Sequence, residues 1–136
     1  MAELEITVER VTHLDETELA QLNLLFGSEW ERGEAARFFA DVDNLLLLAR
    51  CDGQWCGRLY GYRLQRLDRL RAGVLIYEVD VLEPFRRRGV GRAMVEASKV
   101  WVLTEQSNAP AKALYRSAGG EEDAETPTLF VFPIEP

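Results

Sequence analysis

The stretch that decides the fold is EVDVLEPFRRRGVGRAM, residues 78–94, which joins an apolar strand to the start of an apolar helix. Three consecutive arginines and two glycines lie at the junction. A helix start presents free backbone N–H groups and the positive end of the helix dipole, and the arginines add charge at the same point. Glycine leaves these amides open to a ligand because it has no side chain. We therefore predict an anion site at residues 86–92.

The spacing of these residues excludes the two commonest nucleotide loops. The stretch lacks the Gly-Lys followed by Ser or Thr of the nucleoside-triphosphate loop, and it lacks the third glycine of the dinucleotide fingerprint. A formal charge of −7 also argues against a nucleic-acid partner, because the chain would repel the phosphate backbone. The acidic surplus favours a cationic second ligand, although it serves solubility equally well.

Length and composition predict one domain, residues 1–136, with no membrane span. A chain of this length buries about two thirds of its unfolded surface on folding. Its apolar runs fall short of the roughly 20 residues that a bilayer requires. The opening residues carry neither a basic segment nor an apolar one, so we expect no secretory or transit signal and a cytoplasmic location.

The cysteines and the single histidine predict neither a metal site nor a histidine-based triad. Cys51 and Cys56 flank an Asp52-Gly53 turn of a hairpin, and we expect them to be two structural thiols. Two thiols are too few for a four-ligand zinc site. His13 lies in a connection before a helix, where a surface position is expected.

Hydrophobic periodicity predicts a mixed α/β fold. Strands are expected at residues 4–10, on both sides of the turn within 44–67, and at 73–82, 99–104 and 126–134. Helices are expected at residues 15–26, around 34–40, from 89 onward and at 108–119. The first of these helices begins with Asp15 and Glu18 at capping-box spacing.

Two segments have spacings that are specific to one enzyme family. In the first, Arg86, Gly89 and Gly91 have the spacing RxxGxG and follow the stretch YEVDVLEPF. In the second, NAPAKALYRSAGG, the pattern NxxAxxxYxxxGF is matched by Asn108, Ala111, Tyr115 and Gly119. The two segments resemble the signatures of the GNAT family of acetyl-CoA-dependent N-acetyltransferases, and YEVDVLEPF resembles the family's fourth strand. An aromatic residue is usual where this chain has Gly120. The resemblance implies a central, mostly antiparallel sheet that contains one parallel strand pair and is flanked by helices.

A closer resemblance covers most of the chain. The segments LNLLFGSEW, IYEVDVLEPFRRRGVGRAM and PAKALYRSAGGEED resemble the small GNAT enzymes of the gentamicin and fortimicin type, which acetylate the 3-amino group of aminoglycosides. Asp80 stands where that subfamily has a small residue, and Asn108 where some members have an acid. The resemblance implies acetyl transfer from acetyl-CoA to an aminoglycoside, and hence antibiotic resistance.

The resemblance also implies where acetyl-CoA binds. Its pyrophosphate would lie on the amides and guanidinium groups of one loop, formed by Arg86, Arg87, Arg88, Gly89, Val90, Gly91 and Arg92. Its pantetheine arm would pair with the main chain of Val79 and Val81, as a ligand that adds a strand to the sheet. The residues expected to contact the arm from the other side are Asn108, Ala111 and Tyr115.

Two acids are expected to act on the amine. Period two places Glu78 and Asp80 on the strand face opposite to Tyr77, Val79 and Val81. Acids beside an acyl donor would attract a polycationic amine and could accept its proton, directly or through water. Glu78 matches the acid of the aminoglycoside enzymes and is the first candidate for the base. Solvent-facing acids on an edge strand are the alternative.

Tyr115 is the candidate general acid, since a phenol of pKa about 10 can protonate a leaving thiolate whose thiol has a pKa of about 8.5. A packed core tyrosine is the alternative. Glu121 and Glu122, together with the acids of SEWERGE (28–34), could line the substrate site, but each could equally be solvated surface.

Other functions stay open at this point. The substrate could be a polyamine or a protein amine, or the domain could bind acyl-CoA as a sensor without catalysis. We expect no nucleic-acid or membrane partner, and family habit suggests a homodimer. Residues 89–98 are too few for a crossover between parallel strands, which needs a dozen or more. Either the family's long helix is shortened here or the chain is discontinuous at Ala97-Ser98, and we expect the discontinuity.

Overall fold

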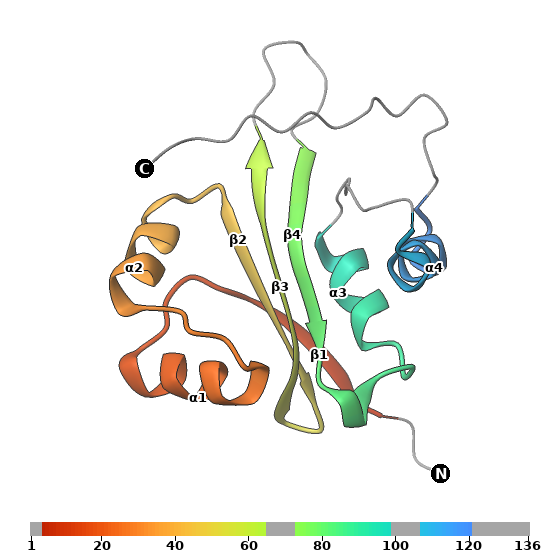
Figure 1. The fold of residues 1–136 in the computed structure, drawn as a ribbon, viewed down its shortest axis with the longest axis horizontal. Coiled ribbons are helices and arrows are strands. Elements are labelled where there is room, and N and C mark those ends of the chain that lie inside the picture. The colour runs from red at the N-terminus through yellow and green to blue at the C-terminus, as the bar shows by residue number, and fades with distance from the viewer. Residues whose placement is uncertain (1–3, 65–72, 99–106, 121–136) are drawn as a thin grey trace.

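The structure, a computed structural model, describes residues 4–64, 73–98 and 107–120. Its strands form one antiparallel sheet in the order β1 (Ile6–Val11), β2 (Asn44–Cys51), β3 (Gln54–Leu64) and β4 (Gly73–Val81). Its helices are α1 (Glu16–Phe26), α2 (Arg32–Ala40), α3 (Val90–Ser98) and α4 (Ala109–Ser117), with a 3-10 turn at Glu83–Phe85. Figure 1 shows α1 and α2 on one side of the sheet and α3 and α4 on the other. The predicted α/β class with flanking helices is confirmed.

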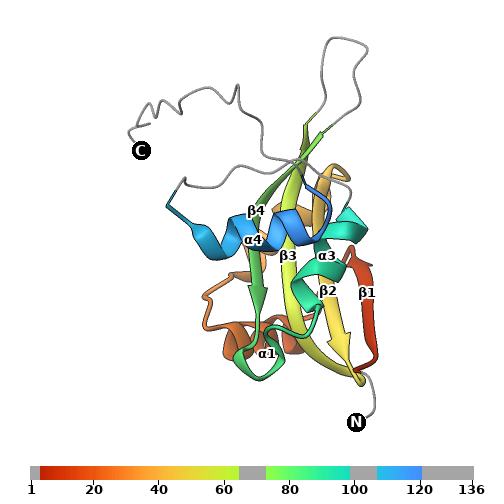
Figure 2. The same ribbon diagram turned by 90° about the vertical axis from the view of Figure 1, so that its right-hand side faces the viewer.

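The sheet face toward α3 carries the larger apolar core. Helix α3 packs on all four strands, and Figure 2 shows it with α4 in front of the sheet. The buried side chains of this core are Leu45, Leu47, Ala49, Cys51, Cys56, Leu59, Ile76, Val90 and Met94. Burying one large aliphatic side chain contributes about 1.5–3 kcal/mol. This core therefore fixes the start of α3, which directly follows the arginine run.

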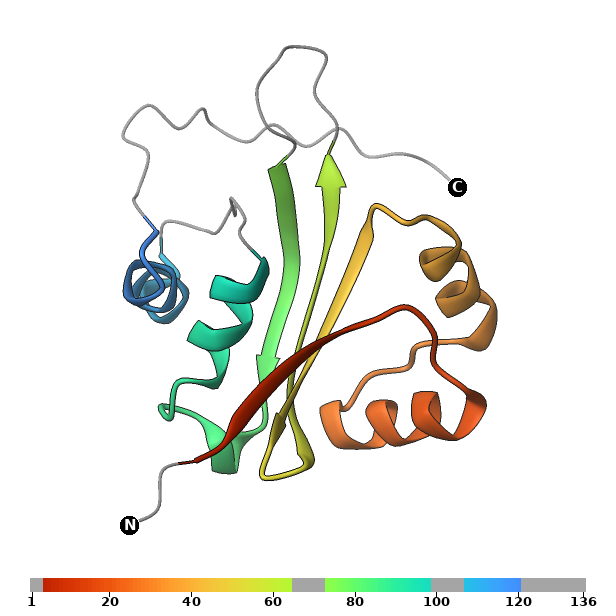
Figure 3. The same cartoon turned by 180° about the vertical axis from the view of Figure 1, so that it is seen from behind.

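The opposite face, toward α1 and α2, is less densely filled. Its fully buried residues are Leu22, Leu46 and Leu48, and the half-buried side chains around them include Phe26, Trp30, Phe38, Phe39, Trp55 and Tyr60. Successive residues of β2 thus face opposite cores, which explains why NLLLLA is apolar throughout. Figure 3, a view from behind, shows helices on both sides of the sheet and β1 at its edge.

The pairing of β3 with β4 contains a bulge at Tyr77. Tyr60 pairs with Glu78 and Gly61 pairs with Ile76, so Tyr77 has no partner of its own. The extra residue puts Tyr77 on the same face as Glu78, where its ring stacks on Tyr60 at a centroid distance of 5.3 Å. The prediction that Tyr77 faces away from Glu78 is therefore wrong. The two valines of that prediction do face α3.

A second register shift lies in the β2–β3 hairpin, at the cysteines. Ala49 pairs with Gly57 and Arg50 with Trp55, which leaves Cys56 as the extra residue. Cys51 and Cys56 form a disulfide, with Cα atoms 5.8 Å apart, and both are buried under α3. The expectation of two thiols is therefore wrong. The register shift brings Cys51 and Cys56 onto the same face of the sheet, within the distance that a disulfide spans.

Both ends of α1 have specific chemistry. Asp15 Oδ1 accepts a hydrogen bond from the Glu18 N–H at 2.7 Å, and Glu18 Oε1 accepts one from the Asp15 N–H at 3.0 Å, which confirms the capping box. Gly27 ends the helix with φ +66°, in the left-handed region that favours glycine. The chain thereby turns back toward the sheet, and the following residues reach β3.

The segment after α3 settles one expectation and leaves others outside the described residues. Helix α3 includes Ala97 and ends at Ser98 without a break between them, and Ser98 Oγ donates to the Val95 carbonyl oxygen at 2.7 Å. The expected discontinuity is therefore wrong. The predicted strands at 99–104 and 126–134, and with them the parallel pair, lie outside the described residues. None of the helices in residues 4–64, 73–98 and 107–120 is long and apolar enough to cross a membrane.

Candidate active site

Two carboxylates of β4 and one arginine of β3 form a polar centre on the face toward α1. Asp80 Oδ2 accepts a hydrogen bond from Arg58 Nε at 3.1 Å, and Glu78 Oε1 lies 3.8 Å from Arg58 Nη2. The Arg58 side chain is 2% exposed, whereas those of Glu78 and Asp80 are 36% and 35% exposed. Each acid thus meets a buried cation and remains within reach of a ligand from solvent.

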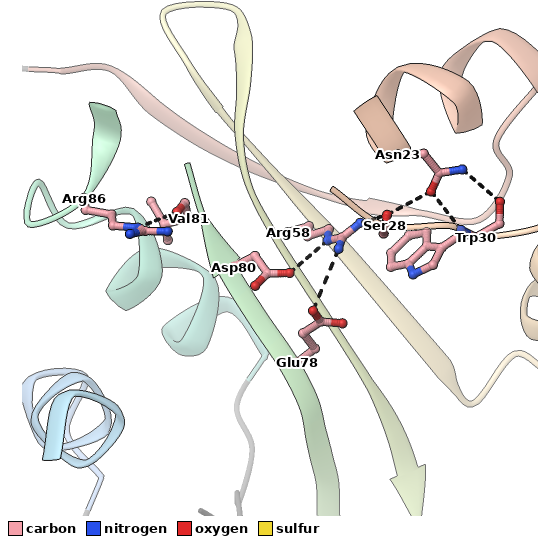
Figure 4. A network of polar contacts seen from close by, with 8 residues as sticks. All are labelled: Asn23, Ser28, Trp30, Arg58, Glu78, Asp80, Val81 and Arg86. Carbon is pink, nitrogen blue, oxygen red and sulfur yellow. Dashed lines mark hydrogen bonds and ion pairs between the residues drawn. The ribbon is translucent and has the colours of Figure 1, made fainter. Parts of the chain in front are cut away.

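Arg58 also connects this centre to the loop after α1, as Figure 4 shows. Its Nη1 donates to Ser28 Oγ at 2.8 Å, and Ser28 Oγ donates to Asn23 Oδ1 at 2.8 Å. Asn23 Oδ1 also accepts from the Trp30 N–H, and Asn23 Nδ2 donates to the Trp30 carbonyl oxygen, both at 2.9 Å. The guanidinium carbon lies 4.2 Å from the centroid of the Trp30 ring and 4.6 Å from that of Phe26. A continuous chain of hydrogen bonds therefore joins the loop to β4.

The environment of Glu78 raises its pKa above the ordinary value. Burial is the largest cause, and the hydrogen bond and charge of Asp80 add to it, while Arg58 and a hydrogen bond from Tyr60 lower it. Burial and the Glu78 charge also raise the pKa of Tyr60, so its hydroxyl stays protonated and donates to the carboxylate. A raised pKa suits a general base, because the carboxylate binds a proton more readily.

A cavity of about 710 Å³ opens beside Tyr60. Its aromatic lining is Trp30, Phe38, Phe39, Tyr60 and Tyr62, and its charged lining is Glu29, Glu31, Glu34 and Arg37. Arg37 forms an ion pair with Glu34, so the other two acids give the lining a negative balance. The acids of SEWERGE, for which surface and substrate site were equal alternatives, thus line this acidic-aromatic cavity.

The arginine run forms the turn that enters α3. Arg87 has φ +61° and Gly89 has φ +91°, both in the left-handed region, where a residue other than glycine has a strained backbone. The side chains of residues 86–88 are exposed. Arg92, on the first turn of α3, donates from Nε to Glu96 Oε1 at 2.9 Å. The turn therefore presents guanidinium groups beside a helix N-terminus, as an anion site requires.

Two residues predicted for the same loop are buried by protein instead. Val90 is 1% exposed and belongs to the core under α3. A Cβ at Gly91 would lie 3.2 Å from Leu114 Cδ1 of α4, so the absence of a side chain there serves helix packing. The main-chain N–H groups of these residues, which have no acceptor within the first turn, are what they can offer to an anion.

The outer edge of β4 has main-chain groups suited to pair with an extended ligand. The Leu82 N–H donates to the Cys56 carbonyl oxygen of β3 at 2.8 Å. Because residues alternate in direction along a strand, the peptide groups of Val79 and Val81 point to the opposite edge. Arg86 Nε reaches the Val81 carbonyl oxygen there at 2.8 Å. Within the described residues, β4 is an edge strand of the sheet.

The residues predicted on α4 lie at its start and middle. Asn108 caps the helix, and its Oδ1 accepts from the Ala111 N–H at 3.1 Å, which leaves the Asn108 amide nitrogen as a donor. Tyr115 is half-buried, and burial raises its pKa. The phenol is therefore held in its protonated form, as a general acid requires.

Sequence reasoning missed Arg58. The available signal was one charge inside the apolar strand WCGRLYGY, but its partners depend on the register between β3 and β4. Glu121 and Glu122 lie outside the described residues. No group of three or more His, Cys, Asp or Glu side chains in the described part of the chain is arranged to hold a metal ion.

Comparison with known proteins gives a consistent picture. Residues 14–119 match the acetyltransferase (GNAT) family. No curated protein matches the chain. An aminoglycoside acetyltransferase from an uncultured soil metagenomic sample, solved in complex with sisomicin, is 18% identical with a TM-score of 0.80 over 96% of this chain and 97% of that one.

Two further solved structures have the same fold. The aminoglycoside 6′-N-acetyltransferase from Acinetobacter haemolyticus is 22% identical, with a TM-score of 0.67 over 95% of this chain and 99% of that one. AAC(6′)-Iy, solved with the bisubstrate analogue CoA-S-monomethyl-acetylneamine, is 15% identical, with a TM-score of 0.73 over 96% and 99%. At these identities the likeness shows a fold shared along nearly the whole chain.

Proposed function

Because this protein belongs to the acetyltransferase (GNAT) family, whose members use acetyl-CoA as the acetyl donor, we propose that it acetylates an amino group of an aminoglycoside antibiotic. One observation carries the proposal: the acidic-aromatic cavity lies against Tyr60, whose hydroxyl binds Glu78. A cavity for the acceptor and a carboxylate for its proton therefore lie side by side.

The lining of the acidic-aromatic cavity suits a polycationic sugar. Glu29 and Glu31 supply negative charge that attracts ammonium groups, and Trp30 and Phe38 offer rings for sugar faces and cations. Several structural neighbours are aminoglycoside acetyltransferases, which supports the same class of substrate. Acetylation removes one positive charge from the drug, and with it part of the drug's attraction to the RNA phosphate backbone.

The other side of β4 suits the donor. The exposed arginines 86–88 and the amides at the start of α3 would hold the pyrophosphate, and the outer-edge groups of Val79 and Val81 would pair with the pantetheine arm. Asn108 would donate to the arm from its amide nitrogen. Bound there, acetyl-CoA supplies an activated thioester.

Two side chains of this chain would move the protons. Glu78, on the face of the acidic-aromatic cavity, would accept the proton that the amine loses, with Asp80 beside it. Tyr115 would return a proton to the leaving thiolate, because its burial keeps the phenol protonated. Replacement of Tyr115 by Phe should therefore slow thiol release while acetyl-CoA binding persists.

We propose the 3-amino group as the acceptor, on the resemblance of residues 76–94 and 110–123 to the enzymes of that type. The 6′-amino group is the competing position, because structural neighbours carry that activity. NMR of the product of gentamicin acetylation separates the two, since acetylation of an amino group shifts the resonances of the carbon attached to that nitrogen.

The decisive test is thiol release from acetyl-CoA with gentamicin, spermidine and a lysine peptide in parallel. We expect strong turnover with gentamicin alone. Turnover with spermidine alone or with the peptide alone would identify that amine as the substrate in place of the drug. Tight acetyl-CoA binding with no turnover of any amine would indicate a sensor.

A charge-matched pair of variants tests the cavity. Neutralising Glu29 and Glu31 by Gln should raise the KM for gentamicin about 2- to 30-fold, because two exposed ion pairs are worth about 0.4–2 kcal/mol together. The control neutralises Glu5 and Glu9, exposed acids at the start of the chain and on β1, and should leave KM unchanged. An equal change in KM for the two variants would show that gentamicin responds to the net charge of the protein and not to the acids of the cavity.

A further inference from the structure

Arg58 is the only charged side chain that is buried in residues 4–64, 73–98 and 107–120. A buried cation must be matched by charge and hydrogen bonds, since its desolvation is expensive. Arg58 meets this requirement with groups from two separate parts of the chain, the β4 acids and Ser28 in the loop after α1. Its position is therefore defined by the contact between these two parts.

The planar guanidinium sets the geometry of that contact. Nε points to Asp80 and Nη1 to Ser28, so one rigid group spans from β4 to the loop. The face of the same group lies over Trp30. A lysine has the charge but neither the fork nor the plane. The distance between the two parts thus depends on an arginine in particular.

We infer that Arg58 is a positioning residue, which holds the carboxylates of Glu78 and Asp80 in a set arrangement with the loop that walls the acidic-aromatic cavity. The inference rests on the proposed function and names how that site is held together. Ser28 is hydrogen-bonded to Asn23, and Asn23 in turn binds both main-chain groups of Trp30. An amine seated against Trp30 therefore meets Glu78 at a defined distance.

The distances also separate the roles of the two acids. Asp80 is hydrogen-bonded to Arg58 at 3.1 Å, whereas Glu78 lies 3.8 Å away and is bound by the Tyr60 hydroxyl. Asp80 is thus the acid that Arg58 holds directly, and Glu78 is the acid that Tyr60 binds and whose raised pKa favours uptake of a proton. The titratable and charged groups on this side of the site are Arg58, Tyr60 and Tyr62 of β3, Tyr77 and Asp80 of β4, and Glu29, Glu31, Glu34 and Arg37 around the cavity.

The test measures the titration of Glu78 by carboxyl-carbon NMR in the protein without substrates, together with the pH profile of kcat/KM for gentamicin. Arg58→Met removes a positive charge that lowers the pKa of Glu78. We expect the titration midpoint of Glu78 and the acid limb of the profile to move to higher pH together. We also expect kcat/KM to fall by up to about 100-fold, as displaced reacting groups do.

Two further variants separate charge from geometry. Arg58→Lys keeps the charge, so the Glu78 midpoint should stay near that of the unmodified protein, while kcat/KM stays low because Asp80 and Ser28 are no longer held together. The double variant Arg58→Met, Asp80→Asn removes the cation together with the acid that is hydrogen-bonded to it. It leaves one unpaired acid fewer than the single variant, and it takes the place of the single variant if that one fails to fold. Its Glu78 midpoint should return downward, with kcat/KM still low.

Arg50 provides the matched control. It lies on β2, pairs with Glu9 at 3.3 Å and has its guanidinium 5.4 Å from the Trp55 ring centroid, but it is 41% exposed and remote from β4. Arg50→Met should change neither the midpoint nor the profile. An unchanged midpoint and an unchanged kcat/KM in folded Arg58→Met, or in the double variant, would overturn the inference. Shifted midpoints without turnover of any aminoglycoside would contradict the proposed function alone.

Discussion

The face of the sheet toward α3 and the face toward α1 and α2 are built in different ways. The first, called the apolar face here, is a core in which aliphatic side chains from β2, β3, β4 and α3 bury one another. The second, called the polar face here, has few fully buried residues, several half-buried aromatic side chains, a buried arginine and the acidic-aromatic cavity. Packing thus fixes the start of α3, whereas hydrogen bonds and ion pairs fix the polar face while leaving room for a ligand.

Replacement of Glu78, the proposed base, should give the largest effect. Glu78→Gln should lower kcat/KM about 10²- to 10⁴-fold, the usual worth of a general base. Because the pKa of Glu78 is raised, the acid limb of the unmodified protein should lie above the ordinary pH for a glutamate, with activity lost as pH falls through it. Steady-state kinetics against pH check both.

The control for Glu78→Gln is Glu9→Gln, which removes a carboxylate that pairs with Arg50 instead of Arg58. It should leave the pH profile unchanged. Activity of Glu78→Gln close to that of the unmodified protein would assign the proton to another group.

On the apolar face, a substitution that creates a cavity should change the stability of the protein instead of its chemistry. Met94 of α3 is 0% exposed, and Met94→Ala should lower the free energy of unfolding by about 2–5 kcal/mol. Urea denaturation measures it. Val42→Ala, at a side chain 77% exposed, is the control and should stay within about 0.5 kcal/mol. An equally small change at Met94 would show that the core under α3 relaxes to fill the space.

On the face toward α1 and α2, helix α1 has a capping box at its start. Asp15→Ala removes the side-chain half of the capping box of α1 and should lower the free energy of unfolding by about 0.5–2 kcal/mol. Thr17→Ala, an exposed change on the same turn, should lie within about 0.5 kcal/mol of the unmodified protein. Identical free energies of unfolding for the two variants would show that the capping box does not stabilise the protein.

The smallest effect concerns Arg92 of α3, beside the proposed site for the pyrophosphate of acetyl-CoA. Glu96→Gln releases Arg92 from an exposed (i, i+4) ion pair worth about 0.3–0.5 kcal/mol, so CoA should bind about twofold more tightly at low salt. Calorimetry at two ionic strengths measures it, because salt screens the gain. Glu9→Gln, which releases Arg50 on the opposite face, should not alter CoA binding. Weaker binding in Glu96→Gln would mean that Arg92 is better placed when paired.

Local features of the chain were largely readable from its sequence. The capping box of α1, the turn of the β2–β3 hairpin, the helix that follows the arginine run and the end of α4 before Gly119 all depend on residues within a few positions of one another. Short-range sterics and hydrogen bonds decide such features, so periodicity and spacing were sufficient. The anion site at residues 86–92 stays a prediction, but the charges and the helix start on which it depends are likewise adjacent in the chain.

The features that required the tertiary structure depend on pairing between distant segments. The bulge that turns Tyr77 toward Glu78, and the register shift that unites Cys51 with Cys56, are set by strand pairing, and a shift of one residue moves a side chain to the other face. The partners of Arg58 are likewise chosen by that register and by the loop after α1. The sequence alone therefore determined the order of the elements and the arginine-rich turn that enters α3. Only the packed sheet decided which acids meet Arg58 and which side chains line the acidic-aromatic cavity, because those contacts form between residues far apart in the chain.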